Sequence, residues 1–110
     1  MTRSELLHRW EQLPLEKVTE MVARKVVAGA DDVVAQTYLK KGALVPRHAH
    51  AVEQMVYVLQ GALRAIVGDE EIMVREGELL RIPRRAAHQA EALDDTFVLD
   101  IRAHDAGIRF

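Results

Sequence analysis

Short apolar runs separated by turn residues are the feature that most constrains the fold of this chain. These runs lie at 17–28, 33–39, 54–59, 62–67, 71–75, 79–82 and 96–101. Gly, Asp and Pro stand between the runs, and these residues supply the positive φ angles and the side-chain hydrogen bonds that turns require. Many short strands joined by regular turns predict an all-β sandwich or barrel.

The N-terminal residues follow a different pattern. Residues 4–12 are expected to form a short helical turn capped by Ser4, in an arm that packs on the main body. Pro14 would end any such helix. We therefore expect a single domain at 1–110, with an arm at 1–14, a barrel at 15–102 and a tail at 103–110.

The composition narrows the possible functions and partners. The 110 residues carry a formal net charge of −2 without a basic cluster, so nucleic acid is not an expected partner. The absence of cysteine excludes disulfides and thiolate metal sites. No run approaches the ~20 apolar residues of a membrane span, and the N-terminus lacks the apolar core of a signal peptide. We expect a soluble, cytoplasmic protein with no membrane partner.

One apolar run bears on assembly. Residues 55–59 are apolar on both faces of the strand that they predict. One face would line the barrel, and the other would be covered by another sheet or another subunit. We therefore expect a homodimer, with an uncovered core face as the simpler alternative.

Two histidines stand two residues apart just before the run at 54–59. Residues two apart in a strand point to the same face, so His48 and His50 could reach one ion together. Gln54 has the same parity if the strand continues. Taken alone, the pair also fits an exposed, polar strand end.

A second motif in the chain gives it a resemblance to the cupin superfamily. The first cupin motif reads Gly, five residues, His-x-His, three or four residues, Glu, six residues, Gly, and it is matched here by Gly42, His48, His50, Gln54 and Gly61. The second reads Gly, five residues, Pro-x-Gly, two residues, His, three residues, Asn, and it is matched by Gly77, Pro83 and His88. The resemblance implies a small single-domain cupin, a jelly-roll barrel also described as a double-stranded β-helix.

Three positions depart from the cupin motifs. Gln54 replaces the usual ligand Glu, Arg85 replaces the second-motif Gly, and Ala92 replaces the Asn. Glu53 is one residue out of register, so its side chain should point to the other face of the strand. Arg85 could relax the turn or place a cation beside the pocket.

The resemblance implies a metal site at four positions, His48, His50, Gln54 and His88. Three imidazoles and an amide oxygen suit a divalent transition metal such as Ni, Zn, Fe or Mn. Because this ligand set is neutral, the ion would keep its full charge. It would then be a stronger Lewis acid and a better anchor for an anionic oxygen ligand.

The last apolar run contains a carboxylate, Asp100. A charged group inside an apolar strand is costly unless it is paired or used. Parity places Val98, Asp100, Arg102 and His104 on one face. Asp100 could therefore form a salt bridge with Arg102 at the rim, or act as a general acid and base.

A more particular resemblance is to the KdgF group of small cupins. It rests on the run WEQLPLEKVTEMVARKVV, on the Gln ligand and on a last strand that ends in Leu-Asp. That group linearises 4,5-unsaturated uronate monomers from pectin and alginate breakdown to ketonic sugars. The resemblance implies Asp100 as the catalytic residue. Candidates for binding a small anionic substrate are Arg102, Arg109, Arg85 and Tyr57.

The tail departs from the KdgF pattern, since Arg102 stands where that group has Phe and no Pro follows. The leading hypothesis is an isomerase-like enzyme for a sugar acid. A metal-dependent dioxygenase remains open, because cupins with three histidine ligands also bind iron and oxygen. A non-catalytic cupin that binds a small sugar acid is the third interpretation. His8 and His104 fit no metal spacing.

Overall fold

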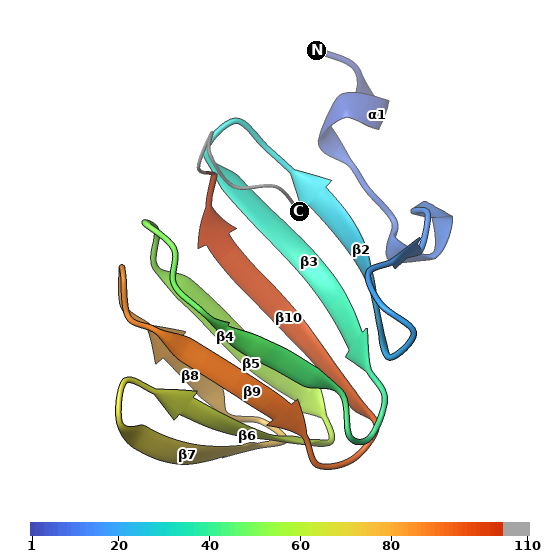
Figure 1. Ribbon diagram of the computed structural model, residues 1–110. Coiled ribbons are helices and arrows are strands. Elements are labelled where there is room, and N and C mark those ends of the chain that lie inside the picture. Colours follow the sequence, from blue (N-terminus) through green and yellow to red (C-terminus); the bar gives the residue numbers. More distant parts are fainter. Residues whose placement is uncertain (105–110) are drawn as a thin grey trace.

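The computed structural model describes residues 1–104, which are almost entirely β-structure (Figure 1). The two helical elements are α1 (Arg3–Leu6) and the 3-10 turn η1 (Trp10–Gln12). The strands are β1 (Glu16–Lys17), β2 (Val22–Ala28), β3 (Asp32–Leu39), β4 (Leu44–His48), β5 (Gln54–Gln60), β6 (Ala62–Val67), β7 (Glu70–Arg75), β8 (Leu79–Ile82), β9 (His88–Ala92) and β10 (Thr96–Ala103).

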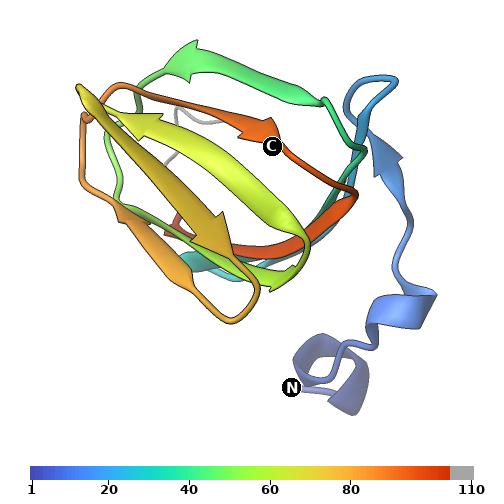
Figure 2. The ribbon, with the colours of Figure 1, turned by 90° about the horizontal axis from the view of Figure 1, so that it is seen from below.

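Two antiparallel sheets face each other and enclose the core (Figure 2). The six-stranded sheet has the order β1-β2-β3-β10-β5-β8, and the four-stranded sheet has the order β4-β9-β6-β7. Alternate side chains point inward, as in β5, where Val56 and Val58 are buried and Tyr57 is exposed. This jelly roll confirms the predicted all-β barrel.

Strand β10 holds the six-stranded sheet together. It pairs with β3 on one side and with β5 on the other, so that Asp100 lies opposite both Ala35 and Val56. A residue at the centre of three paired strands has little freedom to move. The one carboxylate of β10 therefore lies on a strand that is paired on both sides.

The N-terminal prediction is wrong in its bounds. The helix begins after Thr2 and not at Ser4, because the Glu5 carboxylate accepts a hydrogen bond of 2.9 Å from the Thr2 N–H. It ends at Leu6, since Leu7 is extended. The segment also extends away from the barrel (Figure 2), and a hydrogen bond of 2.9 Å from the Lys25 ammonium to the Trp10 carbonyl joins it to β2.

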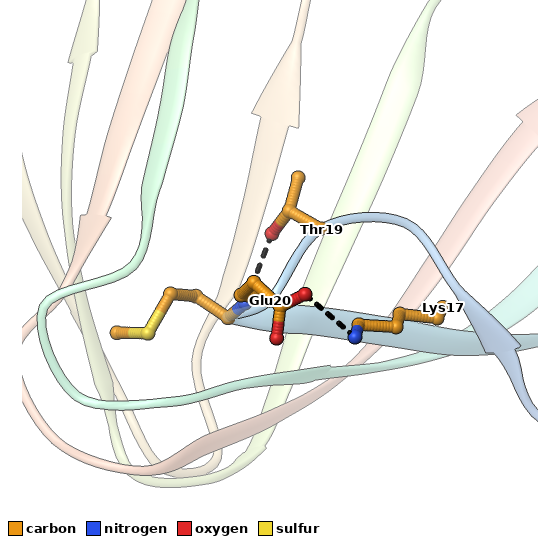
Figure 3. A network of polar contacts seen from close by, with 4 residues as sticks. Lys17, Thr19 and Glu20 are labelled. Atoms are coloured by element: carbon orange, nitrogen blue, oxygen red, sulfur yellow. Dashed lines mark hydrogen bonds and ion pairs between the residues drawn. The ribbon is translucent and has the colours of Figure 1, made fainter.

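The predicted strand over 17–28 is two strands, β1 and β2, joined by a tight turn. The Val18 N–H donates to the Val22 carbonyl at 2.9 Å and closes the turn. Figure 3 shows the side-chain contacts around it: the Lys17–Glu20 ion pair at 2.7 Å and the Thr19 hydroxyl, which accepts a hydrogen bond of 3.1 Å from the Met21 N–H. The apolar residues spread over 17–28 suggested one strand, and they did not indicate the turn within it.

Two strands, β4 and β9, lie outside the predicted apolar runs. β4 is an edge strand that contains Pro46 and is mostly exposed, so it lacks the alternation of a half-buried strand. β9 has the sequence HQAEA, which contains no β-branched or aromatic residue. Tertiary pairing, not local propensity, makes these segments extended. Within residues 1–104, no helix is long and apolar enough to cross a membrane.

Gly61 offers a test of the barrel's packing. Its φ is +89°, and a Cβ atom there would lie 2.5 Å from the Asp95 carbonyl oxygen and 2.6 Å from Thr96 Oγ1. Gly61→Ala should therefore lower the free energy of unfolding by about 2–4 kcal/mol, since the left-handed conformation and the overpacking both cost energy. Urea denaturation measures this loss.

Gly68→Ala is the matched control. Gly68 also has a positive φ, of +60°, but among the described residues no neighbouring atom lies within 4 Å of where its Cβ would be. The free energy of unfolding of Gly68→Ala should fall by only about 1–2 kcal/mol, which is the cost of the backbone conformation alone. Equal losses for the two variants would contradict the role of Gly61 in the close approach to β10.

Candidate metal centre

Three histidines converge at one end of the barrel. His48 ends β4 and pairs in register with His88, which begins β9, while His50 lies in the connection from β4 to β5. Their ring centroids are 4.3–5.5 Å apart, and one nitrogen from each ring lies within 4.8 Å of the other two. This spacing allows a single ion to contact all three rings.

The histidines do not converge in the way the sequence suggested. A continuous strand through His48, His50 and Gln54 was expected, but β4 ends at His48 and Gln54 begins β5, in the other sheet. The chain crosses between the two sheets over residues 49–53. This crossing, and not strand parity, brings Gln54 next to His50. Glu53 does point away, as predicted, and its carboxylate pairs with Arg81 at 2.7 Å.

Each of the three imidazole rings is fixed by a backbone carbonyl. The Nδ1 atoms of His48, His50 and His88 lie 2.8 Å from the carbonyl oxygens of Pro46, Val52 and Ala86. A carbonyl oxygen can only accept a hydrogen bond, so each Nδ1 must carry the hydrogen. In a neutral ring the Nε2 atom then keeps its lone pair. This is the arrangement that metal-ligating histidines usually show.

The Nε2 atom of His88 is buried and, among residues 1–104, has no hydrogen-bond partner. Leaving a buried polar atom unsatisfied costs roughly 1–3 kcal/mol, so such an atom calls for a ligand. The pKa of His88 is lowered, chiefly because burial disfavours the charged ring. The Ala86 carbonyl opposes this effect, while His48, His50 and Arg102 reinforce it. The ring is thereby kept neutral and able to donate its lone pair.

Gln54 supplies a fourth donor atom. Its Oε1 lies 2.8 Å from the Nε2 of His50. Both atoms carry lone pairs when His50 is neutral, so the contact is repulsive unless a proton or a metal cation lies beside it. Neighbouring ligands at right angles in an octahedral shell are about 3 Å apart, so this contact suits a shared ion. The residues present therefore fit a divalent metal.

A cavity of about 190 Å³ extends from His48 and His88 into the barrel. Most of its wall is aliphatic, contributed by Leu39, Val45, Val56, Leu63, Ala65, Val67, Leu80, Ile82, Ala90 and Val98. The chemically active groups share its polar part. A ligand here would thus have both a metal site and an apolar wall around it.

Asp100 and Arg102 line the same cavity as His48, Gln54 and His88. Both oxygens of the Asp100 carboxylate accept hydrogen bonds of 2.9 Å from the Gln54 amide nitrogen. Burial raises the pKa of Asp100, and Arg102, the Gln54 hydrogen bond, His50 and Arg24 oppose the rise. Burial lowers the pKa of Arg102, and Asp100 opposes that change. Both groups are thus partly withdrawn from water. Their electrostatic interactions with a ligand in the cavity are therefore stronger than they would be in solvent.

The other three candidates for substrate binding are placed differently. Tyr57 lies on the outer face of β5 with 37% of its surface exposed, and within the described chain it does not line the cavity. Arg85 has an exposed side chain between β8 and β9, and it too is absent from the described cavity wall. Arg109 lies outside the described residues. Of the four candidates, Arg102 is the one that lines the cavity within residues 1–104, and its role in binding stays a prediction.

Arg85 instead contributes through its backbone. Its φ of +61° is the left-handed conformation that the motif glycine would adopt, so the turn is kept at some cost in strain. Its N–H donates a hydrogen bond of 2.8 Å to the His50 carbonyl, which steadies the metal-site loop. Two further cavity residues, Thr37 and Gln89, were not predicted. The sequence could have indicated only Thr37, because it stands two and four residues after Ala35 and Val33 and therefore points to the same inner face of β3.

Comparison with known proteins identifies the family. The cupin domain profile matches residues 35–101, well over half of the chain. The chain is a cupin. A search of curated protein sequences finds no match.

Among solved structures, KdgF from Halomonas sp. is 26% identical with a TM-score of 0.82, over 88% of this chain and 91% of that one. An RmlC-like cupin from Shewanella frigidimarina is 21% identical with a TM-score of 0.87, over 97% of each chain. The salicylate 1,2-dioxygenase from Pseudoaminobacter salicylatoxidans is 12% identical with a TM-score of 0.73, over 79% of this chain and 28% of that one. The last two likenesses show the fold alone.

The lowered pKa of His88 predicts how the metal-free cupin responds to acid. The unfolded chain takes up the His88 proton as the pH falls through about 6.5, whereas the folded chain resists until a lower pH. The contribution of His88 to the free energy of unfolding should therefore fall between pH 7.5 and 5.5, while the raised pKa of Asp100 acts in the opposite direction. His88→Gln should make this fall shallower, by up to about 1.4 kcal/mol per pH unit.

Chemical denaturation at several pH values in the presence of chelator measures the two slopes. Val67→Ala is the matched control, because it alters the same cavity wall and leaves every histidine in place. It should reduce stability without changing the slope. A His88→Gln slope equal to that of the unchanged protein would show that His88 titrates alike in both states.

Proposed function

We propose that this cupin is a metal-dependent enzyme that linearises 4,5-unsaturated uronate monosaccharides from pectin or alginate breakdown to ketonic sugars. The observation that carries the proposal is the position of Asp100, whose carboxylate lies one amide group away from the histidine cluster in the same cavity. A proton-transfer group and a metal site are therefore available to one small ligand. The likeness to KdgF from Halomonas sp. supports the same reaction.

The cavity offers complementary groups for such a substrate. The Arg102 guanidinium can pair with the uronate carboxylate through two parallel hydrogen bonds. The C4–C5 edge of the unsaturated ring carries no hydroxyl, so it can face the aliphatic wall formed by residues such as Val56 and Val98. When bound, a divalent ion would supply Lewis acidity for the carboxylate and hydroxyl oxygens of the substrate.

Asp100 would move one proton during the reaction. Its carboxylate takes the proton from the hydroxyl on C1, and the aldehyde forms as the bond between C1 and the ring oxygen breaks. The ring oxygen remains on C5 as an enolate. Delivery of the same proton to C4 then gives the C5 ketone. No water or oxidant is consumed, so the step is an isomerisation, and the raised pKa of Asp100 suits both proton transfers.

Turnover of 4,5-unsaturated galacturonate tests this function. Metal-loaded protein should accelerate the loss of its ultraviolet absorbance beyond the spontaneous rate, and a chelator should abolish the effect. Asp100→Asn at saturating metal should lower kcat by about 10²-fold or more, because a general acid and base is lost. Asp94→Asn is the matched control, since it neutralises an exposed carboxylate in the turn between β9 and β10.

Other outcomes point to other cupin activities. If the metal-loaded protein leaves the spontaneous rate unchanged, the uronate reaction is excluded. Oxygen uptake with an organic acid would then favour a dioxygenase. Ligand binding without oxygen uptake or turnover would favour a sugar-acid-binding protein.

We also propose that the protein works as a homodimer in the cytoplasm. Hydrophobic side chains gather on the outer face of the six-stranded sheet, where Tyr57 and Leu79 lie opposite each other on β5 and β8, and Ile101 follows on β10. Their exposed fractions are 37%, 52% and 37%. A contiguous apolar face of this kind is a common site of self-association.

Sedimentation velocity should give the mass of two chains, and Leu79→Lys should shift the protein toward the monomer. Met73→Lys is the matched control, because Met73 is 38% exposed but lies on β7, in the other sheet. A monomer at micromolar concentration for the unchanged protein would overturn the proposed assembly.

A further inference from the structure

Asp100 has a second role that the acid–base function does not include. We propose that it is a positioning residue, which holds the Gln54 amide with its oxygen toward the histidines and so creates the fourth metal ligand. The proposal concerns metal binding and does not depend on the uronate reaction.

The hydrogen bonds around Gln54 define which way its amide faces. Its nitrogen lies 2.9 Å from both oxygens of Asp100. An ionised carboxylate can only accept hydrogen bonds, so the atom that faces Asp100 must be the NH₂ group. The amide oxygen is then left on the other side, 2.8 Å from the Nε2 of His50. Without Asp100, the contact with the lone pair of His50 Nε2 would favour the opposite orientation of the amide.

The opposite orientation would be favourable in the metal-free protein. A reversed amide would donate an N–H to the lone pair of His50 Nε2, and the present repulsion between two acceptors would become a hydrogen bond. That bond would occupy the lone pair that the metal needs and would turn N–H groups toward the ion. Asp100 prevents this reversal, because the Gln54 oxygen would then face its carboxylate. The site is thereby kept ready for a cation.

The two residues are held in rigid, adjacent positions. Asp100 lies on β10 between β3 and β5, and Gln54 begins β5, in register with Arg102 of β10 and Ile82 of β8. Gln54 is also buried, with 9% of its surface exposed. Neither side chain can easily leave the contact. A hydrogen-bond partner held in this way can fix the orientation of a metal ligand.

The pair also explains why Gln occupies the position of the usual cupin Glu. A glutamate in place of Gln54 would bring two carboxylates to within hydrogen-bond distance, and one of them would have to take up a proton. With Gln54, the negative charge sits one amide group behind the metal. The ligand set is neutral, as predicted, but the site as a whole is not. Gln54 and Asp100 therefore act as a matched pair.

Metal titration calorimetry with Ni²⁺ and with Zn²⁺, in the absence of any sugar, tests the proposal. Asp100→Leu should weaken binding by about 10–100-fold, the usual effect of losing a group that orients a ligand. Asp100→Asn should lose less metal affinity than Asp100→Leu, because the new amide oxygen still accepts one N–H from Gln54. The double variant Q54E/D100N should bind within a few-fold of the unchanged protein, since the introduced amide can donate to the introduced carboxylate.

The single variant Gln54→Glu gives a second, metal-free readout. Thermal unfolding in chelator should show a marked loss of stability, because two carboxylates then face each other, and adding Asp100→Asn should restore it. Thr37→Val is the matched control, as it alters the cavity wall without touching Gln54, and its metal affinity should be unchanged.

Two results would overturn the proposal. One is Asp100→Leu binding both metals within twofold of the unchanged protein. The other is Q54E/D100N binding no better than Asp100→Leu while remaining folded. Neither result bears on turnover of the uronate, so a failure here and a failure of the proposed reaction can be told apart.

Discussion

Three hydrogen bonds from imidazole Nδ1 atoms to backbone carbonyls determine what this barrel can bind. Each bond of 2.8 Å leaves a lone pair on the opposite nitrogen, and all three lone pairs belong to rings clustered at one end of the cavity. The metal-free site therefore stores unfavourable contacts: the unpartnered His88 nitrogen and the facing acceptors of Gln54 and His50. A bound cation would relieve them all at once, which would link the stability of the fold to its metal affinity.

The chemistry of the site follows from its place in the barrel. Asp100 and Arg102 lie on β10, inside the six-stranded sheet, and face a cavity whose wall is mostly aliphatic, so both are partly removed from water. This burial moves the pKa of Asp100 upward and that of Arg102 downward. The same low polarity would strengthen the attraction of Arg102 for a small anionic ligand and that of Asp100 for a metal cation. The two roles proposed for Asp100, orienting Gln54 and exchanging protons with a substrate, both draw on this position.

The sequence predicted the strands and the ligand motif that are visible in short, local stretches of residues. Strands β3, β5, β6 and β8 lie in short apolar runs bounded by turn residues, and the spacing of His48, His50, Gln54 and His88 follows a family motif. Strands β4 and β9 lie outside those runs, because their residues do not favour strands and become extended through pairing across the barrel. The Asp100–Gln54 contact spans 46 positions and depends on strand register, which parity alone cannot give. Tyr57 was a candidate for substrate binding but lies on the outer face of β5. Outward- and inward-facing residues of an apolar strand look alike in sequence, so the sequence could not show which face it takes.

A crystal structure of the protein with Ni²⁺ bound, with the ion located by anomalous scattering, would show directly whether the four residues hold one metal. We expect one ion at ~2.0–2.2 Å from the Nε2 atoms of His48, His50 and His88 and from Gln54 Oε1, with the Gln54 nitrogen still on Asp100. An ion bound elsewhere, or a reversed Gln54 amide with Asp100 turned away, would contradict this expectation.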